Sequence, residues 1–381
     1  MRCAELLAAL VLPAGGTEPP PLHESGLESG LRIVVATSSA SSDGSDVSTG
    51  TSNAPIEAVL VVPVGFANDA ARSGSGLAAL AADFATQAPE GQAQAQGTWR
   101  AELLPTRTLY CGRFAADALE AALATLATRL SPDGVEEERF NELVKTRSTP
   151  PPTTVDRFRE TAWPTSRFGA RPRAIPSGPS GSGGAAALSR DALKQFLEQR
   201  VGSEGTVLVL VGAAPPASLE LLAGRALGKV PRARGVAPAE ELEPFPSKAR
   251  RVAAPDGATQ ALVGFRLPWR EDERGDEVAL AAAFLESKAR RPCSCLEATP
   301  QGACIAFADE GPAAGAALRE TLAGAAARLA RGGALEGGEI DAALDRLDAA
   351  LAESASTPAG LARLLAESAA AWDDPRVAFG R

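Results

Sequence analysis

Residues 54–85 read APIEAVLVVPVGFANDAARSGSGLAALAADFA, and residues 258–287 read ATQALVGFRLPWREDERGDEVALAAAFLES. Each stretch gives an apolar run typical of a strand, a Gly-Phe pair, a polar turn with Asp and Arg, and an alanine-rich run typical of a helix. The likeness continues, because residues 303–351 repeat the order of residues 108–144: strand, acidic turn, long helix, short glycine break and acidic helix. A repeat of this length predicts two copies of one α+β domain.

The composition agrees with two folded domains. The chain has 381 residues, more than one hydrophobic core usually serves, and its 45% hydrophobic and 22% charged residues are values of a globular protein. We expect an α+β fold of two homologous domains, each a mainly antiparallel sheet packed with helices. The predicted divisions are a leader or disordered tail over 1–26, an N-terminal domain over 27–190 and a C-terminal domain over 191–381.

Hydrophobic periodicity predicts the elements of the first repeat and of the junction that follows it. The runs 31–40 and 54–66 predict a pair of strands joined by a loose polar connection. The remaining predicted elements are helices over 75–88, 115–130, 135–148 and 155–163, a helix that begins after an N-cap at Ser189, and a strand over 206–213.

Charge and histidine content exclude several classes of function. The net charge of −9 disfavours a nucleic-acid groove, because phosphate contacts need clustered Lys and Arg. The single histidine, His23, falls in the Pro-rich stretch TEPPPLHESG of the predicted tail. A Ser-His-Asp triad or a multi-histidine metal site would have to use this residue, so we expect neither.

The cysteines and the N-terminus leave alternatives open. Five cysteines with a C-S-C spacing do not fit zinc or thioredoxin-like pairs; both a Cys295–Cys304 bridge across a hairpin and plain thiols remain open. Residues 1–16 contain about ten apolar residues, too few to span a bilayer, and we expect no transmembrane segment. A short secretion signal, which would place the protein in the periplasm or outside the cell, and a disordered leader both remain open.

Several motifs together resemble the insulinase and pitrilysin superfamily of zinc peptidases. They are ESGLRIVV (28–35), the V-G-x-x-x-D turn (64–69), the helix start SGLA (75–78) and a helix–strand–helix junction over 189–231. The resemblance covers about residues 25 to 380. It implies two processing-peptidase-like domains, which correspond to the N-terminal and C-terminal domains expected above.

Active members of that superfamily carry H-x-x-E-H on the helix after S-G-L-A, where two histidines bind zinc and the glutamate activates water. Placed on GLAALAADF, the motif falls on Ala79, Ala82 and Asp83. The resemblance implies Glu142 as the remnant of the third zinc ligand, with Glu138 as the alternative register. We therefore expect no zinc, no other cofactor and no catalytic residue.

The resemblance also implies an Arg and a Tyr that hold the substrate backbone. Arg290 or Arg291 stands near the expected arginine, but the chain's single tyrosine, Tyr110, lies elsewhere in the sequence. This departure puts the positioning of peptides in doubt as well as their cleavage.

The function implied is that of a catalytically inactive peptidase-like protein. Relatives build a peptide-binding chamber from two halves, and one half can lack the zinc motif, so the implied partner is a homologous active zinc peptidase subunit or a second copy of this chain. The alternative is a stand-alone structural or scaffold subunit. A third class, an unrelated enzyme that uses carboxylates such as Asp83, Glu136–Glu138 or Asp272, is disfavoured because acidic helix faces are mostly solubilising.

Overall fold

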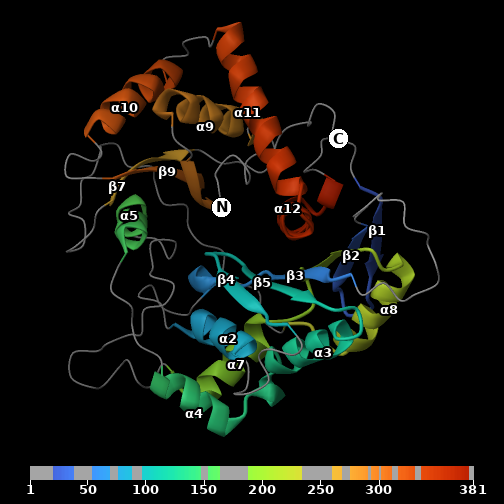
Figure 1. Ribbon diagram of the computed structural model, residues 1–381. Helices are drawn as coiled ribbons and strands as arrows, with labels where there is room; N and C mark the ends of the chain where they lie inside the picture. The colour runs from blue at the N-terminus through green and yellow to red at the C-terminus, as the bar shows by residue number, and fades with distance from the viewer. Residues whose placement is uncertain are drawn as a thin grey trace, which may run out of the picture.

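The computed structural model describes residues 20–37, 54–68, 76–87, 97–146, 153–163, 188–233, 260–267, 275–290, 293–299, 302–310, 316–330 and 336–376 (Figure 1). Its elements form a six-stranded sheet, a three-stranded sheet and helices that cover both. The fold is therefore α+β, as the sequence predicts.

The six-stranded sheet has the order β1-β2-β6-β3-β5-β4 and is antiparallel except where β2 and β6 run parallel. Its strands are β1 (Leu22–Gly26), β2 (Arg32–Thr37), β3 (Ile56–Val62), β4 (Arg100–Leu103), β5 (Thr108–Phe114) and β6 (Val207–Gly212). β6 separates β2 from β3, so the two strands predicted over 31–40 and 54–66 are not neighbours.

Two predicted domain limits differ from this sheet. Residues 22–26, assigned to the leader, form the edge strand β1, on which His23 is exposed. β6 lies beyond the boundary drawn at residue 190, yet it pairs with β2 and β3 in the first sheet. Both differences arise from pairing between distant segments, which the local patterns used to draw the boundaries do not contain.

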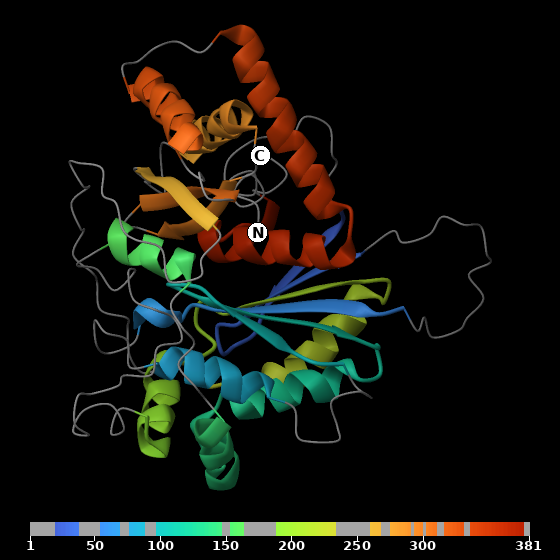
Figure 2. The same cartoon turned by 60° about the vertical axis from the view of Figure 1, so that its left-hand side comes forward.

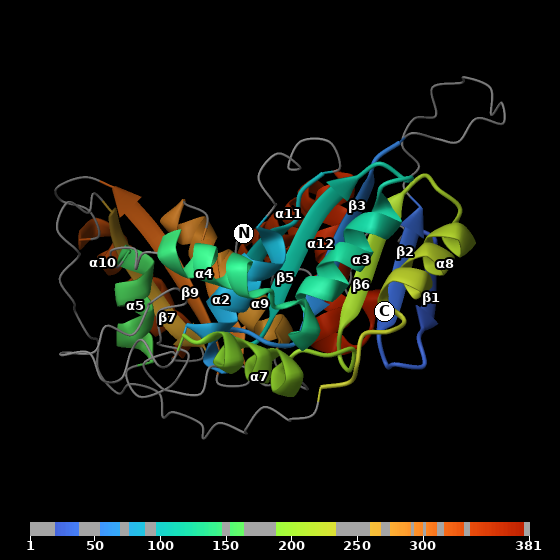
Figure 3. The ribbon, with the colours of Figure 1, turned by 90° about the horizontal axis from the view of Figure 1, so that it is seen from below.

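The central strands are buried on both faces, which explains why they read as continuous apolar runs rather than alternating ones. In β6, Leu208 and Leu210 face one apolar cluster, while Val207, Val209 and Val211 face another. The first cluster includes residues of the helices α2 (Leu77–Thr86), α3 (Leu119–Arg129), α4 (Glu137–Thr146), α7 (Arg190–Arg200) and α8 (Pro216–Leu227). Seen from below, these helices lie in front of the sheet (Figure 3).

The second sheet has the order β7-β9-β8 and is antiparallel throughout. Its elements and the helices that follow are β7 (Gln260–Leu267), α9 (Gly275–Ala289), β8 (Cys293–Thr299), β9 (Gly302–Glu310), α10 (Ala316–Ala330), α11 (Gly337–Ala355) and α12 (Pro358–Trp372). β8 and β9 form the hairpin expected around Cys295 and Cys304, with Cys304 opposite Glu297. Both alternatives given for these two cysteines, a bridge across the hairpin and plain thiols, stay open.

The element order supports the internal repeat found in the sequence. β3, α2, β4, β5, α3, α4 and α5 (Thr154–Ala162) correspond in order to β7, α9, β8, β9, α10, α11 and α12. The strand order agrees too, because β3-β5-β4 in the first sheet matches β7-β9-β8 in the second. Two copies of one α+β unit therefore make up most of the molecule.

The last matching helix of each repeat, α5 in the first and α12 in the second, contacts the sheet of the other repeat. α5 contacts β7, whereas α12 packs on β3 and β6 and lies between the two sheets (Figure 2). α5 begins with a capping box in which Thr153 and Asp156 bond each other's backbone amides, and α12 begins at an N-cap, Thr357, followed by Pro358. Because each of these helices packs on the sheet of the other repeat, the two repeats are joined by packed elements rather than by a linker alone.

Candidate functional site

α2 is the helix on which the superfamily's zinc motif would fall. It begins after Gly76, whose φ of 71° lies in the left-handed region that favours glycine. Positions 79, 82 and 83 share one face of the helix because they are spaced i, i+3 and i+4. Ala79 and Ala82 are each 1% exposed, so their methyl groups are packed inside the protein. Neither side chain has an atom that can bind a metal or accept a proton.

Asp83, the third position on this face, is half-buried, and its negative charge affects the pKa of Tyr110 in β5. Burial and the charge of Asp83 raise the pKa of Tyr110 above its ordinary value. The phenol therefore stays protonated at neutral pH. Tyr110 is 3% exposed within the core of the first sheet, so it is placed to pack rather than to hold a ligand at the surface.

Two arginines hold the C-terminal end of α2. Arg139 of α4 donates to the carbonyl oxygens of Phe84 and Gln87 at 2.7 and 2.6 Å, and its guanidinium lies 4.6 Å from the centroid of the Phe84 ring. Arg129 of α3 donates to the carbonyl of Ala85 at 3.2 Å. Desolvation and the neighbouring Arg129 lower the pKa of Arg139 to about 10, so it remains charged and complements the negative end of the helix dipole.

Glu142 and its alternative Glu138 lie on the exposed side of α4. Together with Glu137, Asn141 and Lys145 they line an open hollow of about 650 Å³. Among the residues that the structure describes, no three His, Cys, Asp or Glu side chains gather as a metal site requires. The donor set around α2 therefore does not fit the zinc that active members of the superfamily bind.

The remaining predicted site residues are dispersed. Arg290 is exposed at the end of α9, in the left-handed backbone region at a φ of 52°. Arg291 and Asp272 lie outside the described residues, as do residues 1–16. Glu136, Glu137 and Glu138 are exposed at the start of α4.

Solved structures of peptidases share this arrangement across both repeats. A predicted insulinase family protease from Yersinia pestis superposes with a TM-score of 0.59 at 20% identity and covers 91% of this chain and 81% of its own. An inactive peptidase domain from Pseudomonas fluorescens gives 0.63 at 14% identity, over 92% and 88%. The chain has the fold of insulinase-family peptidases.

The insulinase-type fold also occurs in an assembly among these relatives. A chain of complex III2 from Candida albicans superposes with a TM-score of 0.68 at 14% identity and covers 94% of this chain and 89% of its own. Neither a protein-family model nor a curated protein matches the sequence. None of the described helices combines the length and the apolar composition that crossing a bilayer requires.

Within this insulinase-type fold, charged residues gather where α12 meets the first sheet, at a place the sequence analysis missed. Arg363 of α12 lies between Glu102 of β4 and Glu367, one helical turn further along α12. The i,i+4 spacing of Arg363 and Glu367 was visible in the sequence, but it is an ordinary helix pair. Nothing in the sequence pointed to Glu102, which is 261 residues from Arg363.

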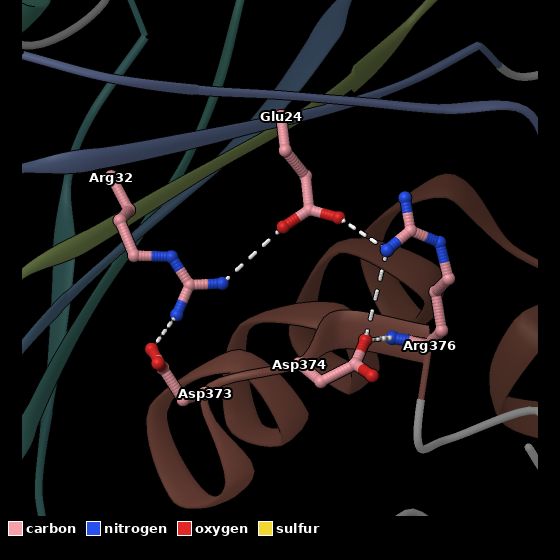
Figure 4. A network of polar contacts seen from close by, with 5 residues as sticks. All are labelled: Glu24, Arg32, Asp373, Asp374 and Arg376. Atoms are coloured by element: carbon pink, nitrogen blue, oxygen red, sulfur yellow. Dashed lines mark hydrogen bonds and ion pairs between the residues drawn. The ribbon is translucent and has the colours of Figure 1, made fainter.

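A second charged network holds the other end of α12 (Figure 4). Arg32 of β2 pairs with Asp373, which follows α12, and with Glu24 of β1 at 3.4 Å. Arg376 bonds Glu24 at 2.7 Å and its backbone amide donates to Asp374 at 2.9 Å. The Asp373 side chain is 91% exposed, so its ion pair with Arg32 is solvated and we expect that pair to add little stability.

Proposed function

We propose that this chain is a non-catalytic, peptidase-like subunit that pairs with a homologous catalytic zinc peptidase and helps to form its peptide-binding chamber. The observation that carries the proposal is the α2 face, where two packed alanines occupy the positions that would bind zinc and activate water. The insulinase-type fold around that face supports the rest.

The chemistry of peptide hydrolysis supports a division of labour between two chains. Zinc peptidases of this class need two imidazole donors and a carboxylate base on one helix face. Ala79 and Ala82 offer no donor, and the carboxylate of Asp83 cannot replace three ligands and a base. An activated water would therefore come from the partner, while this chain contributes wall surface.

The relatives support a role inside an assembly. The domain from Pseudomonas fluorescens is an inactive peptidase domain, and the Candida albicans chain is part of complex III2. The second of these likenesses favours one other candidate function, a structural subunit that has no peptidase partner.

The test is affinity purification of the tagged protein from an extract of its own cells, with mass spectrometry of the eluate and zinc measured in the same sample. We expect a stoichiometric partner that carries an intact H-x-x-E-H motif, and zinc in proportion to that partner. Recovery of the chain without such a partner, within another assembly or alone, would contradict the proposal and support the stand-alone or structural role instead.

A second measurement uses the purified chain alone. We expect substoichiometric zinc and no cleavage of a fluorogenic peptide library, with cleavage appearing only after the identified partner is added. One tightly bound zinc per chain together with peptide cleavage would overturn the proposal.

A further inference from the structure

α12 is the helix through which the second repeat contacts the first sheet. Its apolar side carries Leu361, Ala362, Leu365, Ala366 and Ala369, all buried in the cluster that includes the Val side chains of β3 and β6. Only a two-residue turn, Ser356–Thr357, separates it from α11. Any displacement of α12 from the sheet therefore moves the second repeat as well.

A charged cluster interrupts this apolar contact at the β4 edge of the sheet. Arg363 donates through Nη2 to Oε1 of Glu102 at 2.8 Å, and its Nη1 lies 2.7 Å from Oε2 of the same carboxylate. Its Nε donates to Oε1 of Glu367 at 3.0 Å. The fork of the guanidinium thus engages one carboxylate with two nitrogens and a second carboxylate with the third.

Arg363 compensates for the burial of the two carboxylates, and their pKa values reflect this. The Glu367 side chain is 3% exposed, and desolvation raises its pKa above the ordinary value. Burial also acts to raise the pKa of Glu102, but the hydrogen bonds and charge of Arg363 outweigh it and hold that pKa below its ordinary value. The Glu102 side chain is 41% exposed, so water reaches that end of the cluster, whereas removal of the guanidinium would leave the buried carboxylate of Glu367 without its cation.

The neighbouring groups do not replace Arg363. Burial raises the pKa of the Cys111 thiol to about 11, so Cys111 is neutral, and Glu57 of β3 adds a further negative charge. Arg107, in the turn between β4 and β5, contributes a positive charge to both carboxylates. No hydrogen bond of Arg107 to either carboxylate is found among the described residues, and its Nε is buried without a partner there.

We propose that Arg363 is a latch that holds α12 on the first sheet and so fixes the orientation of the two repeats. The latch is specific because it depends on charge and on the bidentate geometry, whereas burial of the surrounding Leu and Ala side chains is non-directional. Its loss releases α12 from the first sheet before the first repeat itself unfolds. The latch is independent of the proposed function.

The test is hydrogen exchange measured by mass spectrometry on the full chain. In Arg363→Met, which keeps an apolar stem of similar length, we expect peptides from α12 to exchange at least about tenfold faster, while peptides from α3 and α8 keep their wild-type rates. Arg363→Lys keeps the charge but loses the fork, so its exchange rates in α12 should lie between those of wild type and Arg363→Met. The matched control is Arg346→Met, which removes an exposed arginine of α11.

A triple variant separates charge from packing. Arg363→Met combined with Glu102→Gln and Glu367→Gln removes every charge of the cluster, and we expect its α12 exchange to return toward the wild-type rate. The latch is overturned if α12 exchanges at the wild-type rate in Arg363→Met, if all core peptides accelerate equally, or if the triple variant exchanges no more slowly than Arg363→Met. Should Arg363→Met not fold, Glu102→Gln replaces it, and an unchanged α12 rate in that variant would equally overturn the latch.

Discussion

Ala79 and Ala82 are packing residues, and their small size is matched to the space around them. Each is 1% exposed on a helix whose other face buries Leu77, Leu80 and Phe84. A methyl group at such a position excludes water and contributes no polar atom. The same two methyl groups therefore fill the space beside α2 and leave it without a group that could bind zinc or activate water.

Enlargement of Ala82 should destabilise the protein. Ala82→Leu adds three carbon atoms to a closed site, and we expect a loss of about 1 to 3 kcal/mol in the free energy of unfolding. Ala121→Leu, on the exposed side of α3, is the control and should change that free energy by less than about 0.5 kcal/mol. Urea unfolding followed by circular dichroism measures both, and equal midpoints would contradict a closed site at residue 82.

At the scale of elements, charged side chains hold α2 and also join α9, α10 and α11 to one another. In the first repeat, Arg139 of α4 donates hydrogen bonds to carbonyl oxygens at the end of α2. In the second repeat, Glu339 near the start of α11 accepts hydrogen bonds from Lys288 of α9 at 2.7 Å and from Arg328 of α10 at 2.9 and 2.7 Å. Glu339 thus joins three helices of the second repeat through a single carboxylate.

Removal of Arg139 should loosen the end of α2. Arg139→Met leaves the carbonyls of Phe84 and Gln87 without their donor and removes the cation over the Phe84 ring, so we expect a loss of about 1 to 3 kcal/mol. Lys145→Met, at an exposed position of the same helix, is the control. Thermal unfolding compares the two variants, and an unchanged Tm in Arg139→Met would show that the contacts contribute nothing.

Glu339 should make the free energy of unfolding of the second repeat depend on pH in the acidic range. Hydrogen bonds from Arg328, Lys288 and the Glu336 amide lower the pKa of Glu339 from 4.5 to about 2. A carboxyl with a lowered pKa adds stability above its unfolded value, and that stability is lost as the pH falls toward the folded value. Glu339→Gln should therefore be less stable than wild type at pH 6 and approach it between pH 4.5 and 2.

Urea unfolding at a series of pH values measures this convergence. Glu320→Gln, at an exposed position of α10, is the control and should follow the wild-type curve. A constant difference between Glu339→Gln and wild type across the range would show that Glu339 acts through packing rather than through its charge.

The elements that the sequence predicted well are those with local signals. Alanine and leucine spacing placed α2 within two residues of its observed ends, and Ser189 caps α7 by accepting from the amide of Ala192 at 3.0 Å. The sequence also identified Ala79, Ala82 and Asp83 as one helix face. It could not identify the cluster of Glu102, Arg363 and Glu367, because a bond across 261 residues leaves no local pattern.

At the scale of the whole molecule, one apolar cluster runs from the first sheet through α12 into the helices of the second repeat. It joins Val59 and Val209 to Leu365 of α12, to Leu347 of α11 and to Phe284 of α9. The repeat in the sequence predicted two similar units but not this continuity, because the insertion of β6 and the exchange of α5 and α12 depend on contacts between distant segments.

A continuous core should make the repeats unfold together. Leu365→Ala removes a fully buried side chain of α12, and we expect a loss of about 2 to 5 kcal/mol that lowers one common transition. Calorimetry counts the transitions, and hydrogen exchange follows α3 and α10 as reporters of the two repeats. Two separate transitions, with only one of them shifted, would contradict a shared core.

The position of α12 also determines the order in which the protein can be completed during synthesis. β3 leaves the ribosome early, but β6, its neighbour in the sheet, follows well over a hundred residues later, and α12, which covers the face formed by Val59, Val61 and Val209, comes roughly 300 residues after β3. At ~5–20 residues per second, the apolar face of the first sheet waits on the order of 15–60 s for its cover. Until α12 is made, this face of the first sheet is open to pairing with other chains.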